Sequence, residues 1–521
     1  MSARFAWVER HAALVAALVA ALLTLVAGIA TMTPDLVGVF FDDAVYLLVA
    51  KALAAGDGFV YPQLPGTPAA IHYPPLFPLL LSLVWRAVPE FPANVIWFKL
   101  VNPVLLAGAA AGAVVVAQRL FGIRPLFALA VVLAATVSVP VHVLTTVVLS
   151  EPLFLALLFP ALLAAEFARR DGALGWAVAA AALAAALVLT RTIGGVVVIA
   201  TVLVLIHERR PTTLGVYLTA IAVLLLPWQL FVSKHAPGFV PELRGSYGPY
   251  LEWLVDGYRD GGWPLVGEVA SKNITDLVFS VGTMVSPLLR GPLRTVLAML
   301  AVVLLAWGAV VALARPALRV AALALGGYLA LVAIWPYQVE RFVWGVWPLI
   351  LLVAYHGTRD LHFRVGARSP RGSALIVTLA VVLVAGHTCY NVRGFARGWA
   401  SSASRGMAAR LLPIVQYVSG DARLHGKIIG TEASPLVALY TGETVVPVEI
   451  LIVRDHVTEK TLAERAAIIG AIDRRFRPDA YVLMTHGPYL PALLETSFDP
   501  GRRFFEISPS GLPVRAFRIP D

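Results

Sequence analysis

Long apolar runs recur along most of this chain, and they restrict the folds that are open to it. The first run, residues 12–32, consists mainly of Ala, Leu and Val and contains no charged residue. Charged residues make up only 14% of the chain, against about a quarter in soluble domains. A helix of about 20 apolar residues spans a bilayer, so the pattern predicts a polytopic α-helical membrane protein.

About eleven spans are predicted from length and apolar character. They are placed at 12–32, 95–117, 125–142, 149–168, 173–189, 193–207, 213–233, 292–314, 317–335, 342–356 and 373–392. The apolar run 76–88 is too short for a span, and we interpret it as a juxtamembrane or re-entrant helix. The first run is expected to be a retained helix and not a cleaved signal, because no convincing cleavage site follows it.

Arginine clusters between the apolar runs orient the chain. If 76–88 does not cross, every short cluster falls on the same side as Arg4 and Arg10, which the positive-inside rule favours. These clusters are Arg119 and Arg124, Arg169 and Arg170, Arg209 and Arg210, Arg315 and Arg319, and Arg359, Arg364, Arg368 and Arg371. The rule predicts a cytoplasmic N-terminus, with loops 33–94 and 234–290 and the C-terminal part outside.

Two domains are expected from the change of composition near residue 400. Residues 1–398 form the transmembrane domain, and residues 399–521 alternate strand and helix patterns typical of a small extracytoplasmic α/β domain. Its predicted elements are strands at 427–431, 444–447 and 480–484, helices at 434–440, 459–476 and 489–494, and a hairpin of 503–507 with 514–519. The 234–290 loop is interpreted either as a lid or acceptor-facing surface, or as a partly ordered interfacial loop.

Charge and cysteine content exclude several classes of protein. The formal charge is +10, but it lies in the short clusters and forms no basic stripe, so nucleic acid is not an expected partner. Cys389 is the only cysteine, which excludes an intrachain disulfide and a thiol-rich metal site.

Asp42 and Asp43 follow the first span directly and are the first candidates for chemistry. A carboxylate at a membrane edge is costly unless it is solvated, paired or functional. Each is a candidate general base, or a ligand of a divalent cation such as Mg²⁺ or Mn²⁺. The competing interpretation is that Asp43 caps a helix beginning at Ala44.

Glu151, Arg191 and Arg341 are predicted at the same outer edge as Asp42. An outward arginine is a candidate for binding a carboxylate or a phosphate. Glu151 is a candidate catalytic or metal-binding acid, but it also suits the first turn of a helix capped by Ser150. The competing interpretation of Arg341 is an ion pair with Glu340 or Glu151.

Aromatic residues and a histidine of the first outer loop complete the set. Tyr46, His72 and Tyr73 are candidate substrate-binding residues, although a histidine in such a loop is more often a polar surface residue. The Trp and Tyr residues of 335–347 are interpreted as an interface belt, in preference to a sugar-binding platform.

Taken together and in this order, these motifs resemble the GT-C superfamily of membrane glycosyltransferases, above all the lipid A aminoarabinose transferases and the protein O-mannosyltransferases. The resemblance is carried by Phe41-Asp42-Asp43-Ala44 with Tyr46, Gly56-Asp57-Gly58-Phe59, Tyr73-Pro74-Pro75-Leu76-Phe77-Pro78-Leu79-Leu80, Ser150-Glu151-Pro152-Leu153-Phe154, Thr190-Arg191 and the segment from Arg341 to Pro348. Arg341-Phe342 stands where the family has Arg-Tyr, and Asp-Asp where relatives often have Asp-Glu. The division of roles between Asp42 and Asp43 is therefore open.

The resemblance implies an inverting glycosyltransferase at the outer face of a bacterial cytoplasmic membrane, with a polyprenyl-phosphate sugar as donor and a glycan, lipid or protein as acceptor. Asp42 or Asp43 would act as general base, Arg341 and Arg191 would hold the leaving phosphate, and Glu151 would orient the acceptor or complete a metal site. The alternatives are a lipid-linked glycan transporter or flippase, and a non-catalytic membrane subunit.

Overall fold

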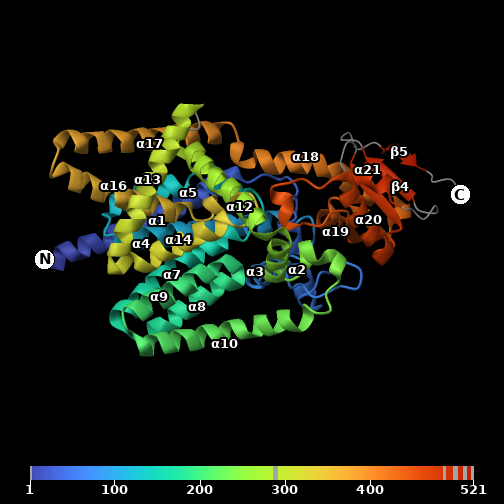
Figure 1. The fold of residues 1–521 in the computed structure, drawn as a ribbon, viewed down its shortest axis with the longest axis horizontal. Coiled ribbons are helices and arrows are strands. Elements are labelled where there is room, and N and C mark those ends of the chain that lie inside the picture. The colour runs from blue at the N-terminus through green and yellow to red at the C-terminus, as the bar shows by residue number, and fades with distance from the viewer. Residues whose placement is uncertain (1–2, 286–290, 485–488, 497–502, 508–512, 518–521) are drawn as a thin grey trace.

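The computed structural model describes residues 3–285, 291–484, 489–496, 503–507 and 513–517. Helices form most of the molecule, and the strands gather at the end that holds the C-terminus (Figure 1). The chain is thus a helical membrane bundle with a β-sheet at one end.

Seven described helices are long and apolar enough to cross a membrane, or eight if one bent pair counts as a single span. The seven are His11–Thr31 of α1 (Ala3–Thr31), α4 (Val95–Arg119), α7 (Glu151–Asp171), α10 (Pro211–His235), α13 (Pro292–Ala314), Pro316–Ala333, which is η3 (Pro316–Leu318) with α14 (Arg319–Ala333), and α17 (Pro370–Ala396). The bent pair is α5 (Pro125–Thr136) and α6 (Val139–Thr146), which meet at 57°. This confirms the polytopic helical class.

Three further predicted spans correspond to helices that do not reach this length and apolar character. They are α8 (Leu174–Thr190), α9 (Gly195–His207), which follows the short η1 (Thr192–Gly194), and the more polar α16 (Trp347–Gly366). The count of about eleven spans therefore stays a prediction.

Small residues allow the spans to approach closely. Buried alanines fill the contacts among α4, α7 and α8, where larger side chains would separate the backbones. Helices α13 and α16 touch through Gly308 and Gly357: a Cβ at Gly308 would lie 2.2 Å from the carbonyl oxygen of Val353. The glycine and alanine content of the chain thus serves helix packing.

The segment 33–94 contains more helix than predicted. The expected short helix is present as α3 (Leu76–Ala87), but residues Asp42–Ala55 also form a helix, α2, inside the predicted loop. Figure 1 shows both helices at the end of the bundle that faces the sheet.

The prediction of a 234–290 loop was wrong for the described residues. This segment contains η2 (Pro241–Leu243), α11 (Arg244–Tyr247) and the long α12 (Tyr250–Val285), which is bent at Gly262 where φ is +64°. Residues 286–290 lie outside the described residues. Glycine and proline suggested a loop, but here they permit a bend and close packing within helical structure.

A five-stranded sheet follows in the order β2-β1-β3-β4-β5. Strands β1 (Ile428–Thr431), β2 (Thr444–Pro447), β3 (Ala480–Met484) and β4 (Arg503–Ile507) are parallel, and β5 (Pro513–Phe517) pairs antiparallel with β4. The connections hold η5 (Val453–His456) and the helices α19 (Ser434–Thr441), α20 (Leu462–Phe476) and α21 (Tyr489–Leu494). These elements agree with the predicted alternation, although the predicted hairpin residues 518–519 lie outside the described residues.

The sheet shares a hydrophobic core with helices α2 and α3. Ile429, Val445 and Val482 of the sheet belong to the same buried cluster as Tyr46 of α2 and Phe77 of α3. The sheet is reached through α18 (Trp399–Gly420) and η4 (Ala422–Leu424), and α18 also packs on α6. The boundary predicted at residue 399 stays a prediction, since packing is continuous across it.

Candidate active site

The start of α2 separates the two adjacent aspartates. Asp43 is fully buried, and its carboxylate accepts hydrogen bonds from the backbone N–H groups of Gly38 (2.7 Å) and Phe40 (2.8 Å). Burial raises the pKa of Asp43 to about 6. Asp43 therefore folds the preceding loop against α2 instead of capping the helix; the N-cap position belongs to Phe41, at φ +64°. Asp42 and Asp43 are consecutive residues of α2, so their side chains point about 100° apart around the helix axis.

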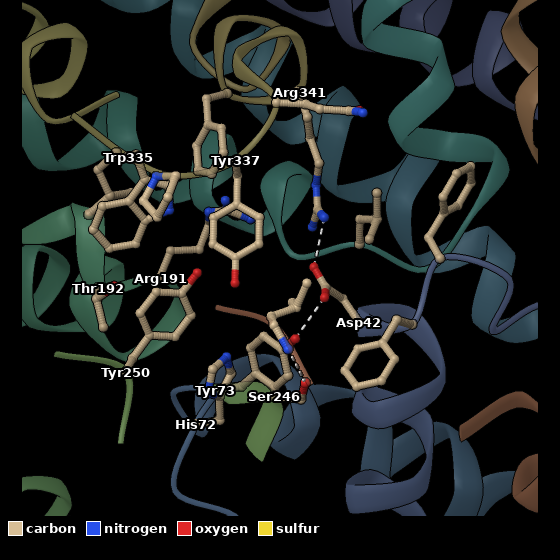
Figure 2. A pocket seen from close by; sticks show the side chains of 18 of the residues that line it. Asp42, His72, Tyr73, Arg191, Thr192, Ser246, Tyr250, Trp335, Tyr337 and Arg341 are labelled. Carbon is tan, nitrogen blue, oxygen red and sulfur yellow. Dashed lines mark hydrogen bonds and ion pairs between the residues drawn. The ribbon is translucent and has the colours of Figure 1, made fainter. Parts of the chain in front are cut away.

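Asp42 faces a cavity and binds an arginine that lies 299 positions later in the sequence. Its Oδ2 lies 2.7 Å from Nη1 of Arg341, and its Oδ1 accepts a 2.6 Å hydrogen bond from the Tyr73 hydroxyl (Figure 2). Burial alone would raise the pKa of Asp42, but Arg341, Tyr73 and Arg191 together hold it below the ordinary value. The Asp42 carboxylate is therefore ionised at neutral pH, and each of its two oxygens accepts a hydrogen bond.

Glu151 ties two arginines together behind the cavity wall. It is 1% exposed and contacts Nε and Nη2 of Arg341, and its Oε1 lies 2.8 Å from Nη1 of Arg191. The ion pair of Arg341 with Glu151 was one of the sequence alternatives, whereas Glu340 is not its partner. Asp42, Glu151, Arg191 and Arg341 form what we call the cavity network, whose formal charges sum to zero.

Helix starts and short helices position this network. Glu151 is the first residue of α7, and Arg191 lies at the break between α8 and η1. Arg341 belongs to the short helix α15 (Val339–Trp344). Ser150 does not cap α7 with its side chain; its Oγ instead accepts a bond from Arg191 (3.1 Å) and meets the Tyr46 hydroxyl (3.3 Å).

The cavity has a volume of about 550 Å³ and is walled by residues from many parts of the chain. Of the predicted site residues, it is lined by Asp42, Tyr46, His72, Tyr73, Arg191 and Arg341. Asp43 and Glu151 are not part of its wall. An apolar side is formed by Val143, Leu144, Val147 and Leu149, in the second half of α6 and just after its end.

His72 lines the cavity in a fixed orientation. It is 3% exposed, its Nδ1 lies 2.8 Å from the carbonyl oxygen of Gly248, and its ring contacts that of Tyr250 (centroids 4.4 Å apart). Burial lowers the pKa of His72 to about 4, so it is neutral at pH 7. A neutral ring must donate from Nδ1 to the carbonyl, which leaves Nε2 as an acceptor.

An aromatic wall stands opposite Asp42, and sequence reasoning missed it. Tyr250 and Trp335 stack with their rings 9° from parallel, and Tyr337 lies next to them (Figure 2). Trp253 contacts the rings of Tyr250 and Tyr337. The sequence favours an interface belt for Trp335 and Tyr337, but in the structure both residues line the cavity. Their position next to Arg341 in the sequence was the signal available.

The described residues do not fit a divalent cation held by Asp42, Asp43 and Glu151. No group of three or more His, Cys, Asp or Glu residues in the described ranges is arranged to hold a metal ion. The Arg341 guanidinium lies between Asp42 and Glu151, and Asp43 is bonded to backbone N–H groups.

Among solved structures, the chain resembles ArnT from Cupriavidus metallidurans. The apo structure of that protein matches with a TM-score of 0.50 and 15% identity, covering 88% of each chain. Its structure bound to undecaprenyl phosphate matches with a TM-score of 0.42 and 15% identity, covering 95% of this chain and 92% of that one. No protein-family model and no curated protein sequence matches this chain. The chain therefore has an ArnT-like fold, in agreement with the resemblance that the sequence motifs indicate.

Proposed function

We propose that this protein is a membrane glycosyltransferase that moves a sugar from a polyprenyl-phosphate donor to an acceptor outside the cytoplasm, with inversion. The fold shared with ArnT supports the reaction class. The role of each residue is supported by its contacts at the cavity as well as by the similarity of fold.

One observation carries the proposal: Arg341 joins Asp42 to Glu151 at the wall of the cavity. Because Glu151 is buried and also binds Arg191, it is a positioning residue that fixes both guanidinium groups. Asp42 is the exposed partner, with 24% of its side chain accessible. An anion that enters the cavity would therefore compete with Asp42 for Arg341 and leave Glu151 in place.

The donor phosphate has the right charge for this exchange. A bidentate guanidinium binds phosphate well, so the phosphate would take over Nη1 of Arg341 and release Asp42. The freed carboxylate would then accept the proton of an acceptor hydroxyl or amine. The new bond forms at the anomeric carbon, the carbon–oxygen bond to phosphate breaks on the opposite face, and the polyprenyl phosphate leaves with its charge held by the arginines.

The membrane location is consistent with such a donor. Glu151 is the first residue of the span α7, and Arg191 follows the apolar helix α8, so the prenyl tail can stay in the bilayer while the phosphate reaches Arg341. The apolar side of the cavity, which includes Val143 and Val147, lies at the end of the bent span α5–α6. We assign the cavity and the sheet to the extracytoplasmic side, following the positive-inside rule.

Transfer by the purified protein tests this proposal. A panel of polyprenyl-phosphate sugars is incubated with candidate acceptors, and Asp42→Asn is compared with Asp57→Asn, which replaces an exposed acid just after α2. We expect Asp42→Asn to abolish transfer without changing expression or melting temperature, and Asp57→Asn to be active. Full turnover by Asp42→Asn would remove that residue from the mechanism, while transport without transfer would favour the flippase alternative.

A further inference from the structure

The C-terminal part of the chain supplies one side of the cavity. Leu451, Ile452, Asp455 and His456 all line it, although they lie more than 100 residues after Arg341 in the sequence. The proposed function gives none of them a role. Their segment, residues 451–456, is held against α12 by specific contacts.

Two glycines make room for this segment. A Cβ at Gly245 would lie 2.1 Å from the carbonyl oxygen of Leu451, and one at Gly257 would lie 2.3 Å from Cγ2 of Val453. Val453 is 1% exposed and packs among apolar residues of α12, and Trp253 donates a 3.0 Å hydrogen bond to the Leu451 carbonyl. The segment is therefore built into the cavity wall.

His456 has a defined tautomer at this wall. The side-chain nitrogen of Asn273 donates to the carbonyl oxygens of Val332 (2.9 Å) and Trp335 (2.6 Å), so the amide oxygen of Asn273 faces His456. Nε2 of His456 lies 2.6 Å from that oxygen, which can only accept, and Nε2 must carry a hydrogen.

The second ring nitrogen of His456 is available to a ligand. Burial, with the positive charge of Lys272, holds the pKa of His456 below its ordinary value despite the opposing charge of Asp276. A neutral ring with hydrogen on Nε2 has a lone pair on Nδ1. Within the described part of the chain, Nδ1 has no hydrogen-bond partner, and it is not a buried atom.

We propose that His456 forms a second subsite of the cavity, in which its Nδ1 accepts a hydrogen bond from a hydroxyl group of a sugar ring. The neighbouring groups suit such a ring, because Tyr250, Trp253 and Trp335 provide aromatic surface in the same cavity. This inference rests on the proposed function and assigns the C-terminal segment a part in sugar recognition. The sugar is carried either by the donor or by a glycan acceptor.

Two substitutions separate direct recognition from support of the fold. In His456→Gln, the side-chain amide can still donate to Asn273, but the Nδ1 acceptor is lost. In His456→Asn, the shorter amide places an acceptor near the Nδ1 position but cannot reach Asn273 as Nε2 does. Direct recognition predicts the larger loss for His456→Gln, and a purely structural role predicts the reverse.

Binding is measured on the full-length protein by tryptophan fluorescence, because Trp253 and Trp335 line the cavity. The probes are a panel of methyl pyranosides and, separately, undecaprenyl phosphate. We expect His456→Gln to weaken pyranoside binding about 5- to 10-fold, as the loss of one hydrogen bond implies. We expect His456→Asn to retain more of it, and both variants to bind undecaprenyl phosphate normally.

Three results would overturn the subsite: no pyranoside binding by the unsubstituted protein, unchanged binding by His456→Gln, or an equal or larger loss in His456→Asn. Failure of the unsubstituted protein to bind undecaprenyl phosphate would count against the proposed function instead. In the transfer assay, a raised KM for the donor in His456→Gln would place the sugar on the donor. A raised KM for the acceptor alone would place it on the acceptor.

Discussion

Helix α7 carries an ion network at each end, and the two networks have the same composition. The cavity network lies at its first residue, Glu151. In its last turns, Arg169 binds Glu166 and Glu208, and Glu208 also binds Arg319; we call these four residues the distal network. Each network has two acids and two arginines, and about 20 Å of helix separates them.

The two networks differ in whether one of their acidic residues faces a cavity. Asp42 lines a large cavity and shares its arginine with a buried acid, whereas no residue of the distal network lines that cavity. The distal network joins the ends of α7, α9 and α14 and brings three of the predicted arginine clusters to one side of the bundle. Ion pairs of one kind therefore serve packing at one end of α7 and, in our proposal, chemistry at the other.

The largest expected effect is on the rate of sugar transfer, when one arginine of each network is replaced by lysine. Arg341→Lys keeps the charge, but one ammonium cannot bond Asp42 and Glu151 as the guanidinium does, nor bind phosphate bidentately. We expect kcat/KM to fall at least about 100-fold. Arg169→Lys is the matched control and should stay within about twofold of the unsubstituted protein, because it lies outside the cavity. Similar losses in both variants would erase the distinction between the networks.

The second comparison concerns stability and replaces one acid in each network. Glu151→Gln leaves two arginines at a site that is 1% exposed, and we expect the free energy of unfolding to fall by about 3 kcal/mol. Glu208 is more exposed, and Glu208→Gln should cost about 1–2 kcal/mol. Thermal unfolding followed by tryptophan fluorescence checks this order. Transfer per folded molecule should fall only in Glu151→Gln; a loss in Glu208→Gln would show coupling across the bilayer.

The sequence predicted the class of fold and all four residues of the cavity network, because each signal was local. A charged residue at the edge of an apolar run stands out whatever it contacts, as Asp42, Glu151, Arg191 and Arg341 did. The aromatic wall and His456 were not predicted, because their place depends on how distant segments pack. Trp253 and His456 lie on α12 and η5, and these two elements are brought together by the fit of Val453 against Gly257 and by the Asn273–His456 hydrogen bond.

The adjacent aspartates extend the same comparison within one site. The pKa of Asp43 is raised by burial to about 6, above the ordinary 3.8, so its contribution to stability is present at low pH and lost as pH rises from about 4 to 6. Relative to Asp43→Asn, the unsubstituted protein should lose about 3 kcal/mol of unfolding free energy over that range. His72, whose pKa is lowered, has the opposite pH dependence but is common to both proteins and cancels. A pH-independent difference would contradict a buried, titrating Asp43.

The smallest expected effect comes from removing the hydroxyl group that donates a hydrogen bond to Asp42. Tyr73 donates a 2.6 Å bond to Asp42, and this bond stabilises the ionised carboxylate. In Tyr73→Phe the pKa of Asp42 should rise, so the acid limb of the pH–rate profile should move to higher pH, with kcat reduced about 3- to 10-fold on that limb and little changed at neutral pH, where Asp42 stays ionised. Tyr46→Phe is the matched control, because its hydroxyl meets Ser150 and not Asp42. An unshifted acid limb in Tyr73→Phe would mean that Asp42 is not the group whose ionisation limits transfer, and the cavity network would then differ from the distal one only in position.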